Sequence, residues 1–284
     1  MSVLENVADL ARIVGNDEAV SVERRDAIYK LGKLGEVAAP AVPVLLKLLD
    51  NDLYTMNVIT TLEYIGKPAA PALPELKAVL RSSASDDQRI AIVAAVWKID
   101  DDPTPALELL PTIPVATYPP ALALGVKTAV EIDRPDLIPF VLRALKSASG
   151  EVRCVAADAL GTLGKHDRVA ALRGLEEALV DKDDDMVRYR AGANWLKLGG
   201  KAATVVPIFE DILVSRFFKV TYQDEAFIRQ KGMPIPPEVQ LDLITLLGAI
   251  GPAAAPALRT LEILGADPSL NSTVEKAISR IRLR

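Results

Sequence analysis

The sequence predicts an all-α protein, an α-solenoid (alpha-alpha superhelix) built from stacked helix pairs. Two observations predict this class. One apolar helical stripe recurs along the chain every 31 to 35 residues, apart from a single longer step, and no convincing strand pattern interrupts it. Half of the 284 residues are hydrophobic, in short runs. One helix pair cannot bury its apolar stripe by itself, so such pairs must stack on one another.

The repeat is clearest at its turn, where LGKLGEVAAPAVP from Leu31 matches YIGKPAAPALP from Tyr64 and AIGPAAAPAL from Ala249. One marker position per copy falls at Gly35, Gly66, Asp100, Asp133, Gly164, Gly199, Gly251 and Arg282, at intervals of 31, 34, 33, 31, 35, 52 and 31 residues. The residues one, four and eight positions before each marker are all apolar or Gly. These offsets trace one face of an α-helix, the first helix of each pair.

A second helix is expected after each turn. Prolines at one shared offset are predicted in its first turn, which tolerates a missing N–H: Pro40, Pro71, Pro105 and Pro256. Acidic segments between copies are predicted to cap the next helix by accepting its free N–H groups: Asp50–Asp52, Asp86–Asp87 and Asp181–Asp185. Six prolines between Pro103 and Pro120 shorten one second helix and predict a largely extended segment over 111–120, either a stiff bend or a binding site.

This turn, together with VRCVAADALG from Val152, resembles HEAT repeats, and most closely the short bacterial kind first named from phycobilisome lyases. The resemblance covers residues 23 to 282 in about seven and a half HEAT-like helix pairs. It implies a single solenoid domain over 1–284, with capping helices at 3–14 and 271–284 and an insertion at 215–237. That family serves many roles, so the resemblance implies no particular activity.

The sequence contains no catalytic constellation, and we expect no enzyme, no cofactor and no metal. Deoxyhypusine hydroxylase, a HEAT-like enzyme, is recognised by paired His-Glu motifs, whereas this chain has only His166. The acids of 181–185 resemble the start of a calcium loop, but Met186 and Gly192 stand where such a loop needs Gly and Glu. A capped turn is favoured there. Cys154 occupies a position that is small and apolar in other copies, so a core role is favoured.

Charge and hydropathy limit the partners. Acidic residues outnumber basic ones, 38 to 33, which argues against gripping a phosphate backbone, so no nucleic acid is expected. No uninterrupted apolar stretch approaches the roughly 20 residues of a membrane span. The first residues lack the features of a signal peptide, and one cysteine fits a reducing compartment. A cytoplasmic location is expected.

The longest step contains RFFKVTYQDEAFIRQKGMPIPPE from Arg216, which holds four of the thirteen aromatic residues. Val205, Phe209, Ile212 and Phe217 continue one helical stripe, so this second helix is predicted to be longer than the others. Aromatic side chains anchor many interfaces, and the local basic excess favours an acidic partner. The predicted partner-binding residues are Phe218, Tyr222, Phe227, Arg229 and Lys231. The alternative is that these rings pack on the solenoid's own edge.

The predicted function is a non-enzymatic HEAT-repeat scaffold that mediates protein–protein interaction. Two alternatives stay open. The chain is a regulatory or accessory array of a larger enzyme whose catalytic domain lies elsewhere, or it resembles the HEAT-like DNA glycosylases. The latter need a basic groove with an aromatic pocket, whereas Trp97 and Trp195 are expected in the helix core.

Overall fold

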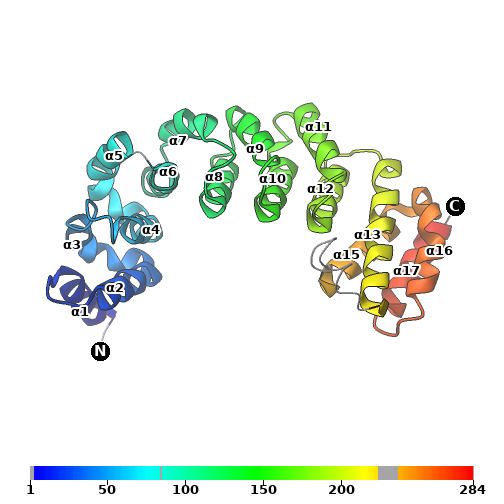
Figure 1. The fold of residues 1–284 in the computed structure, drawn as a ribbon, viewed down its shortest axis with the longest axis horizontal. Coiled ribbons are helices and arrows are strands. Elements are labelled where there is room, and N and C mark those ends of the chain that lie inside the picture. Colours follow the sequence, from blue (N-terminus) through cyan, green and yellow to red (C-terminus); the bar gives the residue numbers. More distant parts are fainter. Residues whose placement is uncertain (1–2, 84, 223–235, 284) are drawn as a thin grey trace. The chain divides into compact units, whose positions relative to one another are not determined.

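The computed structural model describes residues 3–83, 85–222 and 236–283, and it describes no side chains at 3–5 and 215–222. Every secondary-structure element in these ranges is a helix, so the predicted all-α solenoid is confirmed (Figure 1). The chain forms two compact units, Met1–Phe140 and Val141–Arg284, each described by itself. The prediction of one continuous domain stays a prediction.

The first unit is a series of helix pairs joined by short 3-10 helices, labelled η. Its elements are α1 (Val3–Gly15), α2 (Ser21–Leu34), η1 (Gly35–Ala41), α3 (Val42–Leu46), α4 (Thr55–Ile65), η2 (Lys67–Ala72), α5 (Leu73–Ser82), α6 (Asp86–Asp100), α7 (Thr104–Leu109), η3 (Leu110–Thr112), α8 (Pro119–Ile132), η4 (Pro135–Leu137) and α9 (Ile138–Ala144), which contains the boundary of the unit.

The second unit has the same alternation, with one long helix. Its elements are α10 (Gly150–Leu163), α11 (Arg168–Leu179), α12 (Asp185–Lys197), α13 (Ala202–Tyr222), α15 (Pro237–Ile250), η5 (Gly251–Ala257), α16 (Leu258–Leu264) and α17 (Asn271–Arg282). The capping helices predicted at the two ends correspond to α1 and α17.

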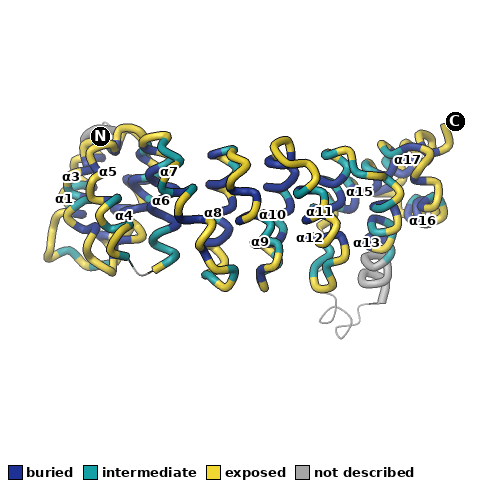
Figure 2. Tube along the Cα trace, turned by 90° about the horizontal axis from the view of Figure 1, so that it is seen from above, coloured by how far each residue is buried: buried dark blue, intermediate teal, exposed yellow. Residues whose placement is uncertain are grey.

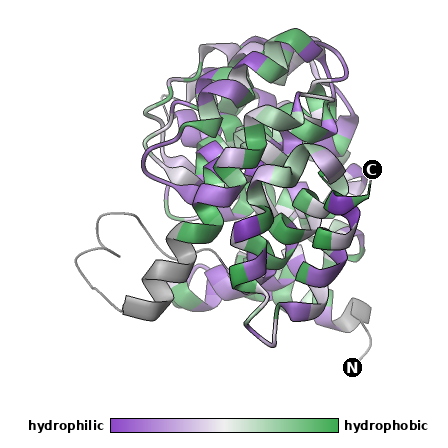
Figure 3. Ribbon diagram, turned by 90° about the vertical axis from the view of Figure 1, so that its right-hand side faces the viewer, coloured by the Kyte–Doolittle hydropathy of each residue, from purple (hydrophilic) through white to green (hydrophobic). Residues whose placement is uncertain are grey.

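First helices of successive pairs pack on one another within each unit. In the first unit α2 packs on α4, α4 on α6 and α6 on α8; in the second unit α10 packs on α12 and α15 on α17. The stripe predicted from the repeat is the buried face, for example Leu31, Leu62 and Val96, which are fully buried. Hydrophilic and hydrophobic residues are mixed along the helices (Figure 3), and buried and exposed stretches alternate along the chain (Figure 2).

Glycines with positive φ end three of the first helices. Gly35, Gly66 and Gly251 have φ of 59°, 69° and 71° with ψ near −140°, a region open essentially to Gly. At the equivalent turns after α6 and α8, Asp101 and Asp133 adopt the left-handed helical conformation instead, which Asp tolerates better than other residues with a side chain. These five turns therefore reverse the chain direction by two different backbone geometries.

The prolines at the shared offset differ from the prediction at three of the four positions. Pro40, Pro71 and Pro256 lie inside the 3-10 helices η1, η2 and η5 rather than in the first turn of an α-helix. A 3-10 turn uses i→i+3 bonds, so the short Gly/Pro turn expected from the sequence is a helical segment of six or seven residues. Pro105 is in the first turn of α7, as predicted.

Two further expectations are corrected. The acids of 50–52 make no side-chain cap on α4, and Ser85 rather than Asp86 or Asp87 caps α6 by accepting from the Gln88 N–H. The segment before α8 is not extended throughout. It contains a turn closed by the Thr117 N–H and the Pro114 carbonyl, and α8 already begins at Pro119 because Pro is favourable at a helix start.

The long step differs from the others in how its helices pack. α13 spans 21 residues, so the predicted extension of this second helix is confirmed. Val205, Phe209 and Ile212 of the predicted stripe are fully buried. α13 packs against α12, α15, η5 and α16, whereas α12 and α15 lack the close packing seen, for example, between α10 and α12. α13 therefore supplies many of the helix contacts that join the repeat before the long step to the repeat after it.

One described segment, Pro237–Leu264, is long and apolar enough by composition to cross a membrane. In the structure it is two helices of one repeat: α15 ends at Ile250, Gly251 has φ of 71°, and α16 begins at Leu258. Both α15 and α16 pack on α17, and the segment carries four charged residues. A spanning helix needs roughly 20 continuous residues, so this segment is weak support for a membrane location.

We predict that Leu160→Ala destabilises the protein by about 2–5 kcal/mol, because it truncates a side chain that is 0 % exposed and leaves a cavity in its place. Val169→Ala is the matched control, since Val169 is 70 % exposed. Urea unfolding followed by circular dichroism measures both. Equal stability of Leu160→Ala and the wild type would show that the buried stripe is assigned wrongly.

We also predict that Gly66→Ala destabilises the protein by about 1–3 kcal/mol through backbone strain. A Cβ at Gly66 would meet no atom closer than 4.0 Å, so steric contact does not explain the loss. Asp133→Ala is the comparison, because left-handed Asp133 loses a smaller conformational preference. Thermal melting that shows no loss for Gly66→Ala contradicts the backbone argument.

Candidate functional site

The structure places only part of the predicted partner site. Phe218 and Tyr222 belong to the last turns of α13, but their side chains are not described. Phe227, Arg229 and Lys231 lie outside the described residues. The grouping of these five residues therefore stays a prediction.

Buried arginine ties two repeats together in the second unit. Arg153, at the start of α10, donates from Nε and Nη2 to both carboxylate oxygens of Asp181, at 2.6 and 3.2 Å. Its Nη1 donates to the carbonyls of Ser147 and Ala148. The side chains of Arg153 and Asp181 are both about 10 % exposed. A bidentate pair with satisfied donors favours a fixed geometry, so the contacts of Arg153 are structural.

Asn194 forms a second tie, which the sequence did not indicate. Its Nδ2 donates to Asp158 of α10 at 2.9 Å and to the Arg190 carbonyl at 3.0 Å. Arg190 in turn pairs with Asp158 at 2.7 Å. Asn194 lies so close to Gly161 that a Cβ there would meet Asn194 Oδ1. A polar residue at this repeat position therefore joins α10 to α12, using space left by a glycine.

Contacts across the long step are also polar. Arg188 of α12 pairs with Asp185 at 2.9 Å and with Asp211 of α13 at 2.7 Å. The Tyr189 hydroxyl donates to Asp242 of α15. Burial, together with this acidic hydrogen-bond partner, raises the pKa of Tyr189 to about 12. The Tyr189 bond joins α12 to α15, two helices that do not pack closely themselves.

The acids of 181–185 are engaged by the chain. Asp181 Oδ1 accepts from the Asp183 and Asp184 N–H groups as well as from Arg153. Asp184 accepts from the Met186 N–H and so caps α12. In the part of the chain that the structure describes, no cluster of three or more His, Cys, Asp or Glu could hold a metal ion. This loop has the arrangement of the capped turn that the sequence favoured.

The remaining chemical candidates lie within helix packing. Cys154 is half-buried, and burial, followed by the nearby charge of Asp184, raises the pKa of its thiol to about 12. Trp195 is buried, and its indole N–H donates to the Lys201 carbonyl at 3.1 Å. Trp97 is half-buried on α6. A thiol with a raised pKa is a poor nucleophile.

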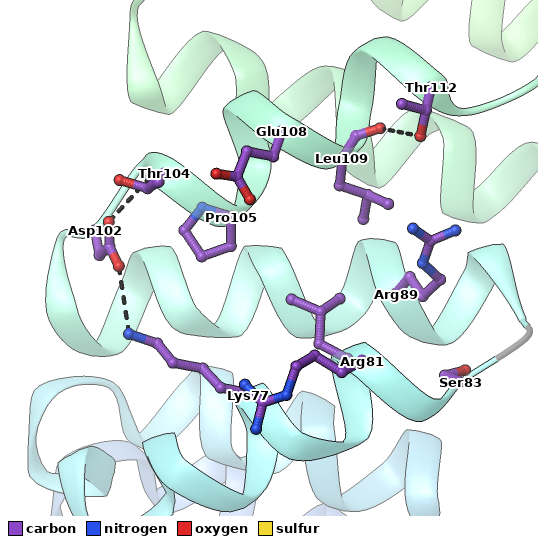
Figure 4. A pocket seen from close by; sticks show the side chains of 11 residues that line it. Lys77, Arg81, Ser83, Arg89, Asp102, Thr104, Pro105, Glu108, Leu109 and Thr112 are labelled. Carbon is purple, nitrogen blue, oxygen red and sulfur yellow. Dashed lines mark hydrogen bonds and ion pairs between the residues drawn. The ribbon is translucent and has the colours of Figure 1, made fainter.

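A cleft of about 650 Å³ in the first unit lies between α5, α6 and α7 (Figure 4). Lys77, Arg81, Arg89, Asp102 and Glu108 line it. Lys77 pairs with Asp102 at 3.3 Å, and Arg89 pairs with Asp86 at 3.3 Å. Partial burial acts to raise the pKa of Asp102, but hydrogen bonds from Thr104 and Lys77 outweigh it, so the pKa lies below its ordinary value. Lys77, Arg89 and Asp102 are therefore paired within the chain, and the lining contains both charged and apolar side chains.

Two smaller grooves of the first unit were not predicted. One, of about 150 Å³, lies between α2 and α4 and is lined by Tyr29, Met56 and Tyr64 among others. The other, of about 370 Å³, extends from Met56 of α4 to Tyr118 and Leu124 beside and on α8. Periodicity identifies the buried stripe of a helix, whereas exposed tyrosines leave no periodic signal. They are visible only once the helices are stacked.

Stacked helix pairs joined by buried polar ties define the class of protein as an α-solenoid repeat scaffold. Family models identify the repeat. The model for HEAT repeats matches residues 120–194, and the model for the PBS lyase HEAT-like repeat matches residues 23–51. The predicted resemblance to HEAT repeats is confirmed over these residues. A search of curated proteins found no match.

Two solved structures similar to this chain are crystal structures of engineered proteins. One is 18 % identical and covers 98 % of this chain and 78 % of its own, with a TM-score of 0.54. The other is 15 % identical and covers 83 % of this chain and 96 % of its own, with a TM-score of 0.32. The first likeness shows the fold.

We predict that Cys154 reacts slowly with iodoacetamide in the folded protein. With a pKa of about 12 instead of 9.0, it holds roughly 1,000-fold less thiolate at about pH 8 than an unperturbed thiol. The pKa of Cys154 is higher in the folded than in the unfolded protein, so the stability that the thiol contributes is complete below the unfolded pKa. This stability is lost as the pH rises from the unfolded pKa through the folded pKa. Mass spectrometry of native and guanidinium-denatured protein measures the ratio of alkylation rates. Equal rates would contradict the assigned environment.

Proposed function

We propose that this protein is a non-enzymatic scaffold that binds another protein, and that residues 215–237 form its partner site. The observation that carries the proposal is the length of α13. Its 21 residues exceed those of every other described second helix, and its last turns contain Phe218 and Tyr222. A helix that continues beyond its repeat presents a surface that repeat stacking does not require.

The composition after α13 supports a protein partner of acidic character. Aromatic and Arg side chains are enriched at interface anchors, and the segment contains Phe227, Arg229 and Lys231 in a chain of net charge −5. Opposite charge on the partner would raise the association rate. Nucleic acid and membrane are not part of the proposal.

The polar groups of the described residues are consistent with a structural rather than a catalytic use. Arg153, Asp181 and Asn194 bind neighbouring repeats, and the pKa of Cys154 is raised. Catalytic sites usually tune such groups toward neutral pH. The protein therefore acts by binding through its surface rather than by catalysis.

We predict that replacing Phe218, Tyr222 and Phe227 together by Ala abolishes recovery of the partner without altering the melting temperature. Cross-linking in an extract of the source organism, followed by purification and mass spectrometry, measures recovery. The matched control replaces Val169, Val180 and Ile263, three exposed apolar residues, by Ala.

The opposite result is equally defined. If the three rings pack on their own chain, the variant melts earlier, because each buried ring contributes roughly 1.5–3 kcal/mol. Unchanged partner recovery with this variant would overturn the assignment of the site to 215–237.

A further inference from the structure

Three tyrosines of the first unit expose more than half of their surface. Tyr29 of α2, Tyr64 of α4 and Tyr118, just before α8, are 57 %, 59 % and 61 % exposed. An exposed aromatic ring leaves apolar surface in contact with water. The same ring is a strong binding anchor when a partner covers it. Their gathering along one series of first helices is a feature that stacking does not explain.

The two grooves beside these rings share one lining residue. Met56 of α4 lines both the groove toward α2, with Tyr29 and Tyr64, and the groove toward α8, with Tyr118. Met adapts its shape to different contacts. Tyr64 also lies close to Gly32, where a Cβ would approach its ring to 3.4 Å. The tyrosine groove, defined as the surface lined by Tyr29, Met56, Tyr64, Tyr118 and Leu124, thus extends from α2 to α8.

Charge differs between the two ends of the tyrosine groove. At the α2 end, Arg25 and Lys33 lie one helical turn before and after Tyr29, and the Lys33 ammonium is 5.3 Å from the centre of the Tyr29 ring. Neither Arg25 nor Lys33 forms an ion pair with any residue that the structure describes. The nearby Asp26 is already paired with Lys30 at 2.7 Å. This end therefore favours carboxylates.

The α8 end is apolar. Tyr118, Pro120, Ala121 and Leu124 line it, and the one charged residue that lines it is Asp87 of α6. Asp87 disfavours a second carboxylate there through like-charge repulsion. This end therefore favours apolar side chains, in contrast to the α2 end.

The dimensions limit the length of the occupant. α2, α4, α6 and α8 pack in sequence, and neighbouring helix axes are about 8–10 Å apart, so the tyrosine groove is roughly 27 Å long. An extended chain advances about 3.3 Å per residue, so roughly eight residues cross it. An extended peptide is the form that fits such a length.

From these observations we propose that the tyrosine groove binds an extended protein segment with acidic residues at one end and apolar residues at the other. This inference rests on the proposed scaffold function but uses a surface distinct from residues 215–237. A single-stranded nucleic acid is disfavoured, because a uniformly charged backbone would meet Asp87 at the apolar end.

The test uses the full chain and a display library of random 12-residue peptides. We expect enriched sequences to combine acidic residues with Leu, Ile, Phe or Pro. The tightest peptide, labelled with fluorescein, is then titrated by fluorescence anisotropy. Replacing its acidic residues by the corresponding amides should weaken binding at least tenfold, and added salt should weaken it as well.

Two variants locate the binding surface. Tyr29→Ala with Tyr64→Ala removes the aromatic anchors, and Arg25→Glu with Lys33→Glu reverses the charge at the α2 end; we expect each to weaken binding at least tenfold. All four side chains are exposed, so the melting temperature should hold. The matched controls lie in the second unit: Val169→Ala with Val180→Ala, and Arg173→Glu with Lys182→Glu, all exposed. Both controls should bind within twofold of the wild type.

The outcomes separate the two proposals. Absence of enriched peptides, binding that survives both groove variants within twofold, or tighter binding of a single-stranded oligothymidine at the same residues would each overturn the tyrosine groove as a peptide site. If the Phe218, Tyr222 and Phe227 variant loses its cross-linked partner while both groove variants keep it, the scaffold function stands and this inference fails. If groove variants lose the selected peptide and the Phe218 variant keeps its partner, only the assignment to 215–237 fails.

Discussion

Burial of the first-helix stripe is the constraint on which the rest of the molecule depends. A pair such as α4 and α5 has no core of its own, so Leu62 and Ile65 are removed from water only because α2 and α6 lie on either side. Each pair is therefore both a layer of the protein and the cover for its neighbours. α1 packs on α2 and α3, and α17 packs on α15 and α16, in the same way. This dependence also explains why nearly every turn must reverse the chain within a few residues.

Polar contacts fix the relative position of neighbouring helices, which apolar packing alone does not determine. Arg153 with Asp181 and Asn194 with Asp158 join successive repeats of the second unit at defined atoms. In the first unit, Thr61 of α4 donates to the Ile28 carbonyl of α2 at 3.0 Å. Apolar stripes can slide along each other at small cost, whereas a satisfied buried hydrogen bond is lost when the helices shift. The ties thus fix how one repeat meets the next and what surface the array presents.

The sequence was sufficient for the fold and insufficient for the surface. Residues at 3.6 periodicity predicted the stripe, the helix pairs, both end helices and the long α13, because burial leaves a regular pattern. The prolines Pro40 and Pro71 were assigned to the wrong kind of helix, since Pro suits a 3-10 turn as well as a helix start. The tyrosine groove could not be predicted. Tyr29, Tyr64 and Tyr118 lie 35 and 54 residues apart, and only the stacking of α2, α4 and α8 brings them along one surface.

The spacing of the repeat ties has a consequence for folding kinetics. Arg153 and Asp181 are 28 residues apart and Thr61 and Ile28 are 33, so these junctions close short loops, as in chains of low contact order. Such chains nucleate at many places and fold fast. The bond from Tyr189 to Asp242 spans 53 residues, and closing that loop costs about 0.5 kcal/mol more in chain entropy. The junction that follows α12 is therefore expected to form last during folding and to open first in hydrogen exchange.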